Sequence, residues 1–251
     1  MVMMAVAAFL VGACIGSFLN VVIHRLPRGE SIVSPRSRCP GCGRAIRAWE
    51  NIPIASFVVL GGKCAGCGGA ISWRYPAVEA LTAVGFCAIY LLVGHGIQLL
   101  RDLLFFSLLV PIVFIDIDHR IIPDELSLGG LAAGLLFSFI PGGDWKGSTI
   151  GALLGGGILY ATAILYERIR GTEGMGGGDI KLLAMIGAFL GWRGALATVF
   201  FGSFLGAVGG ILAMRKGGEG LKTAIPFGPY LCVAALLSRY LGGWFWGMPF
   251  I

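Results

Sequence analysis

Three aspartates in apolar surroundings are the residues of this sequence best placed to do chemistry. Asp116 and Asp118 end one apolar run, and Asp179 follows three glycines at the head of another. A carboxylate near hydrocarbon is energetically expensive, so its presence there indicates a functional site. Two carboxylates that meet can share a proton and activate a water molecule, which is the chemistry of aspartic proteases.

The elements that must position these aspartates are membrane-spanning helices. Hydrophobic residues make up 57% of the 251 residues and charged residues 13%, with a mean hydropathy of +0.86, whereas a soluble domain carries about 25% charged residues. The 42 glycines fit closely packed membrane helices. Eight apolar runs are visible, at 2–23, 77–94, 101–117, 125–141, 148–166, 180–192, 194–214 and 226–242. The run at 180–192 is the weakest and is interpreted as a broken or half-inserted helix.

The fold class expected from this pattern is an all-α polytopic membrane protein with about eight transmembrane helices. Residues 1–23 are predicted to form the first transmembrane helix rather than a cleaved leader, because no basic region precedes them. Residues 24–76 are predicted to form a small cytoplasmic zinc-binding loop. Residues 77–251 are predicted to form a multi-helix membrane domain that carries the aspartates.

The basic residues predict the orientation of these helices. With the N-terminus outside, 15 of the 19 lysines and arginines lie on the cytoplasmic side. The four exceptions are Arg101, Lys146, Arg193 and Arg239. Asp116, Asp118 and Asp179 then share the cytoplasmic face, where they can meet. The positive charge is dispersed over short loops, which fits a membrane lipid environment and predicts no nucleic-acid partner.

The long loop contains two C-x-x-C pairs, Cys39 with Cys42 and Cys64 with Cys67, and 21 residues separate the pairs. This spacing is typical of a tetrahedral zinc site. Two disulfides or a redox pair are the alternatives, but thiols stay reduced in the cytoplasm. Four cysteine ligands leave no open position, so the zinc is expected to be structural.

The residues around Asp118, Asp124 and Asp179 predict a different structural position for each of these aspartates. Asp118 is two residues from Asp116, so on a helix at most one of them faces Asp179. Asp124 follows Pro123 and precedes an apolar run, which predicts a position at the N-cap or in the first turn of a helix. The glycines at 176–178 are expected to give Asp179 a backbone that can unwind and approach a substrate.

The sequence resembles the type IV prepilin peptidases, a family of membrane aspartic proteases of the G-x-G-D class. Several motifs in order along the chain carry the resemblance. They are residues 16–27 (GSFLNVVIHRLP), the two cysteine pairs, 50–54 (ENIPI), 74–79 (RYPAVE), 115–119 (IDIDH), 122–124 (IPD) and 173–182 (EGMGGGDIKL). The chain departs from the family pattern at His24, where a tyrosine is expected, and at Phe57, where a tryptophan is expected.

The resemblance implies a bifunctional enzyme of the bacterial inner membrane. Such enzymes cut the short basic leader from type IV prepilins and from the prepilin-like pseudopilins of type II secretion, after a glycine and at the cytoplasmic face. They then methylate the new amino terminus, using S-adenosylmethionine. The catalytic pair of the family maps onto Asp179 and Asp116, because Asp116 precedes Pro123 by the seven residues associated with the family. Asp118 is the reserve candidate.

In the mechanism expected for such a pair, one aspartate is ionised and acts as general base on a water molecule, while the other is protonated and polarises the scissile carbonyl. Both titrate as one coupled system, which predicts a bell-shaped pH profile.

The methyl-transfer site is less visible, because the chain has no Rossmann pattern of strand, G-x-G-x-x-G turn and helix. The resemblance points to the N-terminal half, where Gly16, Asn20, Arg25 and Glu79 lie near the first loop. A carboxylate such as Glu79 can hold a ribose or the new amino terminus, or it can pair with Arg74 or Arg25. The cofactor-binding residues therefore remain unassigned.

Three other readings of the sequence remain. An ion-coupled membrane transporter also uses intramembrane carboxylates and glycine-broken helices, but here the carboxylates lie at one face and not at the midplane. The second reading is a peptidase without methyltransferase activity, although by resemblance the long cysteine loop favours the bifunctional form. A membrane anchor with a zinc loop leaves the glycines before Asp179 unexplained.

Overall fold

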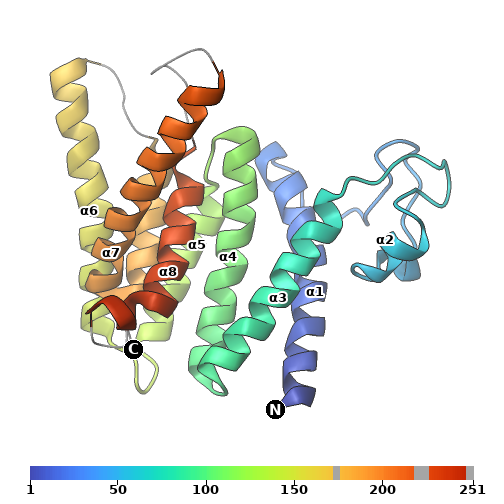
Figure 1. Cartoon of the computed structure of the whole chain (residues 1–251), viewed down its shortest axis with the longest axis horizontal. Helices are drawn as coiled ribbons and strands as arrows, with labels where there is room; N and C mark the ends of the chain where they lie inside the picture. The colour runs from blue at the N-terminus through green and yellow to red at the C-terminus, as the bar shows by residue number, and fades with distance from the viewer. Residues whose placement is uncertain (172–175, 218–225, 247–251) are drawn as a thin grey trace. The chain divides into compact units, whose positions relative to one another are not determined.

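The computed structural model describes residues 1–171, 176–217 and 226–246, and this part of the chain is helical, as predicted (Figure 1). Its α-helices are α1 (Val2–Arg25), α2 (Ala55–Val59), α3 (Arg74–Val93), α4 (Ile97–His119), α5 (Asp124–Ser138), α6 (Trp145–Arg170), α7 (Gly177–Gly217) and α8 (Gly228–Trp246). Two short 3-10 helices, η1 (Leu26–Arg28) and η2 (Ala48–Asn51), lie in or beside the long loop. Extended pairing within the described residues is limited to two isolated bridges in that loop.

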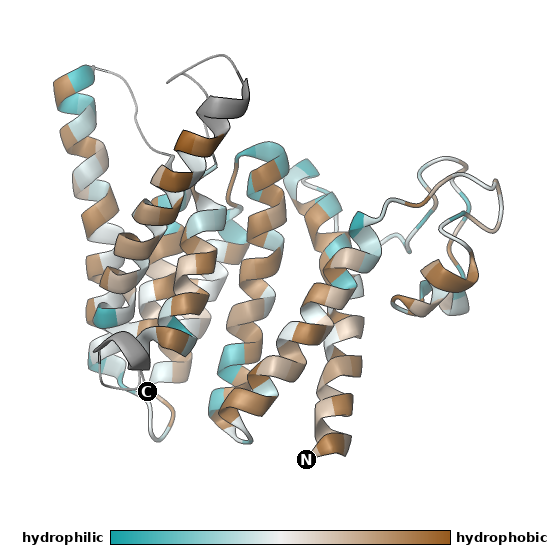
Figure 2. Cartoon of the chain, in the orientation of Figure 1, coloured by the Kyte–Doolittle hydropathy of each residue, from teal (hydrophilic) through white to brown (hydrophobic). Residues whose placement is uncertain are grey.

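Each of the eight apolar runs of the sequence coincides with a helix or with part of one. Apolar residues cover these helices along most of their length (Figure 2). Within the described residues, four helical segments are long and apolar enough to cross a membrane: Val2–Arg28, Arg74–Val93, Trp145–Arg170 and Gly177–Leu212. The all-helical membrane class is therefore supported, while the number of spans stays a prediction.

Helix α7 is interrupted where the sequence predicted a broken helix. Gly191 has φ 70° and ψ 179°, a conformation outside the helical region that glycine adopts without a steric penalty. The runs 180–192 and 194–214 thus fall on either side of this break. The first half of α7 packs on α6, since Gly187 meets the backbone of Gly151.

The chain divides into two compact units, Met1–Pro111 and Ile112–Ile251. In the first unit, α1 packs closely on α3. A Cβ atom on Gly12 would lie 2.8 Å from the Thr82 carbonyl oxygen, and one on Gly16 would lie 2.7 Å from the Cα atom of Glu79. Small residues let the two helix backbones approach, which brings the polar end of α1 beside Glu79.

In the second unit, α7 packs against α5, α6 and α8 (Figure 1). Glycines of its second half face α8, where Gly202 meets Leu231 and Gly206 meets Phe227. This packing holds the N-terminal ends of α7 and α8 in the unit that also contains the end of α4.

Candidate aspartyl site and cysteine cluster

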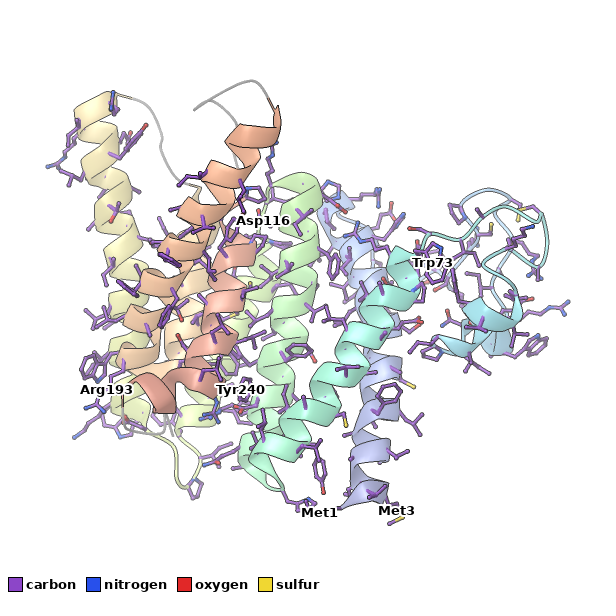
Figure 3. All side chains as sticks on the ribbon, viewed as in Figure 1. Met1, Met3, Trp73, Asp116, Arg193 and Tyr240 are labelled. Atoms are coloured by element: carbon purple, nitrogen blue, oxygen red, sulfur yellow. The ribbon has the colours of Figure 1, made fainter. Side chains whose placement is uncertain are left out.

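Asp116 and Asp118 lie at the end of α4 and differ in burial. Asp116 is 5% exposed, whereas Asp118 is exposed. Asp116, which is labelled in Figure 3, accepts at its buried Oδ2 atom a hydrogen bond of 3.0 Å from the backbone N–H of Gly228, the first residue of α8. The helical geometry separates the two side chains, and Asp116 is the one that faces the interior of its unit.

Asp179 lies in the first turn of α7 and is half-buried. Its carboxylate interacts electrostatically with that of Asp116. The buried thiol of Cys232, one turn after Gly228 on α8, interacts electrostatically with both carboxylates. The structure thus brings together the two aspartates that the sequence singled out. The N-terminal ends of α7 and α8 both present partial positive charge there, which favours an anionic group.

The turn after α4 contributes Ile122 to this site. Arg120, with a φ of 56°, ends α4, and its N–H bonds the Asp116 carbonyl oxygen at 2.9 Å. Ile122 then packs against two glycines, because a Cβ atom on Gly178 would lie 3.0 Å from its Cβ atom and one on Gly228 would lie 3.3 Å from its Cδ1 atom. A larger residue at either glycine would push Ile122 away.

Gly176 and Gly177 behave differently from Gly178. An added Cβ atom at either position would have no neighbour within 4 Å. This open backbone beside Asp179 fits the predicted approach of a substrate, which stays a prediction. The preceding residues of the motif, 173–175, lie outside the described part of the chain.

Asp124 has the structural position that the sequence predicted, in the first turn of α5. Its carboxylate also pairs with the Lys181 ammonium group, at 2.7 and 2.8 Å. Both side chains are well exposed, so this surface pair contributes little to stability.

Sequence reasoning missed Gly228, which touches Asp116 through its N–H and lies 112 residues away. The local signal is a glycine between Pro226 and Pro229 at the head of an apolar run. This pattern indicates a constrained helix start but does not say which side chain the start contacts.

The four loop cysteines lie together. The sulfur atoms of Cys39, Cys42, Cys64 and Cys67 are all within 4.8 Å of one another, and those of Cys39 and Cys67 are 3.9 Å apart. A tetrahedral zinc with Zn–S bonds of about 2.3 Å requires sulfur separations of about 3.8 Å. The cluster therefore has the dimensions of a zinc site.

The backbone of each cysteine turn supports metal binding. The bridges Arg38 to Ala45 and Lys63 to Ala70 close the two turns. The backbone N–H groups of Cys67 and Gly66 lower the pKa of the Cys64 thiol to about 6. A thiolate is the form that binds a metal.

An ion pair connects the cysteine cluster to the segment that follows it in the loop. Arg44 donates to both carboxylate oxygens of Glu50 at 2.8 Å, and its guanidinium lies against Gly66, in the turn between Cys64 and Cys67. Arg44 and the backbone N–H of Arg47 hold the pKa of the Glu50 carboxyl below its ordinary value. Glu50 therefore stays ionised at neutral pH.

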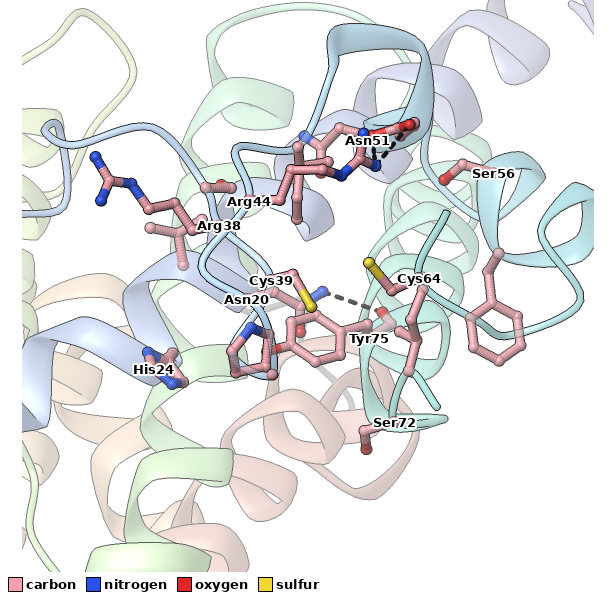
Figure 4. A pocket seen from close by; sticks show the side chains of 18 of the residues that line it. Asn20, His24, Arg38, Cys39, Arg44, Asn51, Ser56, Cys64, Ser72 and Tyr75 are labelled. Atoms are coloured by element: carbon pink, nitrogen blue, oxygen red, sulfur yellow. Dashed lines mark hydrogen bonds and ion pairs between the residues drawn. The ribbon is translucent and has the colours of Figure 1, made fainter. Parts of the chain in front are cut away.

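A cavity of about 620 Å³ lies between the loop and the adjoining ends of α1 and α3 (Figure 4). Of the residues discussed for methyl transfer, Asn20, Arg25 and Glu79 line it, whereas Gly16 lies behind it in the contact between α1 and α3. The Glu79 carboxylate accepts the N–H of Ile54 at 2.7 Å. This partner is not one of the arginines that the sequence suggested.

Two family models match the chain. The Bacterial Peptidase A24 N-terminal domain matches residues 10–93, and the Type IV leader peptidase family matches residues 103–211. The first model covers the cysteine loop with α1 and α3, and the second covers both aspartates.

Several curated relatives carry the name prepilin leader peptidase/N-methyltransferase. The protein of Myxococcus xanthus is 44% identical over 86% of this chain and 64% of its own length. The proteins of Aeromonas salmonicida and Pseudomonas aeruginosa are each 38% identical over 93% of this chain and 89% of their own length. No solved structure gives a significant match. From the aspartate pair, the cysteine cluster and these similarities, the chain belongs to the type IV leader peptidase family, together with the prepilin leader peptidase/N-methyltransferases.

Proposed function

We propose that this chain removes the leader peptide of type IV prepilins and prepilin-like secretion proteins, and that it methylates the new amino terminus. The names of the relatives support both activities. The observation that carries the proteolytic half is the buried Asp116 carboxylate, held by the Gly228 N–H and interacting with Asp179. Asp116 and Asp179 are the proposed catalytic residues, and the exposure of Asp118 argues against it.

In the proposed cleavage, a water molecule lies between the two carboxyl groups. The ionised aspartate takes a proton from the water as the oxygen attacks the scissile carbonyl carbon. The protonated aspartate gives its proton to the carbonyl oxygen. The tetrahedral intermediate then collapses, the C–N bond breaks with its electrons on nitrogen, and the amine leaves with a proton from the pair. The open backbone at Gly176 and Gly177 gives an extended substrate room beside Asp179.

For the second activity, S-adenosylmethionine supplies the methyl group. We also propose that the four cysteines hold one structural zinc ion. The sulfur positions support this ion, and a site of four thiolates leaves no coordination position for a substrate. Zinc then stabilises the loop but does not take part in peptide cleavage.

The proposed location is the bacterial inner membrane, with about eight spans, the N-terminus outside and the aspartates at the cytoplasmic face. The distribution of basic residues supports this orientation. This orientation fits leader cleavage, because a prepilin is synthesised in the cytoplasm and its leader is reached from that side.

Cleavage of a prepilin in membranes that contain single Asp→Asn variants tests the proposal. Asp116→Asn and Asp179→Asn are expected to abolish leader removal, because each leaves the pair without one carboxyl group. Asp118→Asn is the matched control, since it makes the same change two residues away on an exposed side chain. If Asp179→Asn still cleaves at normal protein levels, the peptidase assignment is wrong, and ion transport becomes the activity to assay.

A further inference from the structure

The cysteine loop has an apolar outer surface that neither proposed activity uses. Resting on the proposed membrane location, but on neither enzymatic activity, we propose that this surface docks on the anionic phospholipid headgroups of the membrane that α1 and α3 enter. The loop then lies in the interface between headgroups and acyl chains without crossing the bilayer. Three observations carry the inference: the exposed apolar side chains, their depth beside α3, and the cations that border them.

Large apolar side chains are exposed on three adjoining segments of the loop. Each leaves more than half of its surface uncovered, and they are Trp49, Ile52, Val58, Val59 and Trp73. The first two lie in or beside η2, which contacts α2, and the two valines end α2, which is apolar in Figure 2. Trp73 lies beside α2, since its ring centroid is 4.7 Å from that of Phe57. An exposed apolar surface of this kind marks contact with a membrane or with another protein.

The position of α2 along α3 matches an interfacial depth. Ile54, the residue before α2, donates its N–H to the Glu79 carboxylate at 2.7 Å. Glu79 is five residues after Arg74, the first residue of α3, which corresponds to about 7.5 Å along a helix axis. Interfacial segments are buried to about 5–10 Å at the boundary of headgroups and acyl chains. Helix α2 therefore begins level with the second turn of α3, a candidate membrane span.

The backbone of Ile54 shows that this depth is enforced by the surrounding structure. Ile54 has φ 63° and ψ −51°, which is a rare conformation for a β-branched residue. Strained residues of this kind persist where neighbouring structure fixes them, and they concentrate at functional sites. Here the strained turn directs the Ile54 N–H to Glu79 and holds the start of α2 against α3.

Exposed cations border the apolar surface. The guanidinium carbon of Arg47 lies 5.4 Å from the centroid of the Trp49 ring. Lys63 follows α2, where its N–H bonds the Leu60 carbonyl oxygen at 3.2 Å, and the side chains of both cations are exposed. Residues 24–76 contain eight lysines and arginines but two glutamates, so the loop stays positive even if four thiolates and one zinc ion add a charge of about −2. This charge complements anionic headgroups.

Depth and composition together favour lipid over a protein as the occupant. Tryptophan beside lysine or arginine is the combination enriched at membrane–water interfaces. A protein partner would have to reach the level of the second turn of α3, where lipid surrounds a spanning helix. Lipid reaches that level without any further component, and it continues from the outer face of α3 onto the loop.

Tryptophan fluorescence of the full-length chain in vesicles tests the docking. The vesicles contain phosphatidylglycerol and phosphatidylcholine with bromine on the acyl chains, which quenches tryptophans that contact lipid. Subtracting the emission of Trp49→Phe from that of the wild type isolates Trp49. We expect Trp49 to be quenched by bromine close to the headgroups and to be shielded from iodide in the water. Trp192, isolated in the same way, is the positive control, because it is exposed within the apolar segment Gly177–Leu212.

Two variants then test which side chains make the contact. Val59→Ser should lower the ratio of docked to undocked loop, reported by Trp49 quenching, by about tenfold, because it removes an apolar side chain from the lipid. Val33→Ser is the matched control, since Val33 is equally exposed in the same loop but lies outside this surface. The double change Arg47→Gln and Lys63→Gln covers the case in which Val59→Ser does not fold, and should lower the ratio by about 30-fold in anionic vesicles. The zinc content of each variant shows that its loop is folded.

The outcomes separate docking from the membrane location itself. If iodide quenches Trp49 and brominated lipid does not, while Trp192 is quenched by lipid, the docking is wrong. Shielding of Trp49 only after a prepilin is added would then assign the surface to a protein. Unchanged Trp49 quenching in both folded variants would also overturn the proposal, because the lipid contact would not depend on this surface. If lipid does not quench Trp192 either, the membrane location is wrong, which is a separate result.

Discussion

The contact between Gly228 and Asp116 predicts a large effect from a single added methyl group. In Gly228→Ala, the new Cβ atom would lie 2.6 Å from the Asp116 Oδ2 atom. A carbon and an oxygen atom in contact lie at about 3.3 Å or more, so the carboxylate must move by about 0.7 Å. If the carboxylate moves directly away from the Gly228 nitrogen, the present N···O distance of 3.0 Å becomes about 3.7 Å, beyond the hydrogen-bonding range.

The expected loss follows from the energy of this one contact. A hydrogen bond to a charged group contributes about 1.5–3 kcal/mol, and about 1.4 kcal/mol corresponds to a tenfold change in rate. Gly228→Ala should therefore lower kcat for leader cleavage by about 10- to 150-fold. The KM for the prepilin should change little, because Gly228 contacts the carboxylate that is proposed to be catalytic and is not expected to bind the distant parts of the substrate.

The assay is the initial rate of leader removal from a prepilin, measured over a range of substrate concentrations. Gly157→Ala is the matched control, since it makes the same change in a helix, at a position where the added methyl group has no neighbour within 4 Å. A Gly228→Ala protein that is folded and has the kcat of the wild type would refute the idea that this N–H positions Asp116.

Three further perturbations give independent checks. Removing zinc with a chelator should release one metal ion per chain and lower the Tm, measured by metal analysis and calorimetry; an unchanged Tm of the metal-free chain would contradict a structural role for the ion. The lowered pKa of Glu50 stabilises the loop above its unfolded pKa, and this stabilisation is lost as pH falls through the lower folded value. The Tm deficit of Glu50→Gln at pH 7 should therefore shrink below about pH 4.3, and a deficit independent of pH would contradict this. Gly187→Val should lower the Tm by several degrees, because it forces α7 off the Gly151 backbone, whereas a Tm like that of the wild type would show that the two helices separate at little cost.

The sequence predicted the features that depend on local pattern. Apolar runs gave the helices, the weak run at 180–192 predicted the break that the structure has at Gly191, and the spacing of the cysteines predicted their cluster. The two-residue separation of Asp116 and Asp118 predicted that only one faces inward, since helical geometry rotates the chain by roughly 200° over two residues. Burial then identified that residue as Asp116.

The contacts that fix the carboxylates could not be predicted in this way. The Gly228 N–H reaches Asp116 across 112 residues, and the Ile54 N–H reaches Glu79 across 25. A backbone N–H has the same chemistry at every residue except proline, so the sequence does not indicate which N–H contacts a given carboxylate. Only the packing of α8 in the second unit and the strained turn at Ile54 in the first unit select these donors.

Asp116 and Glu79 thus both accept a hydrogen bond from a backbone N–H, which suggests how a membrane protein can keep carboxylates near hydrocarbon. A side-chain cation would neutralise each carboxylate and occupy the lone pairs that must meet a water molecule or a ligand. A single backbone N–H instead satisfies one lone pair, leaves the others available, and adds no flexible side chain to order. Because the donor belongs to the backbone, no substitution other than proline removes it directly. The informative changes are therefore those that separate the donor from the carboxylate, such as Gly228→Ala, and comparing them with changes of the carboxylates separates the positioning of an acid from its chemistry.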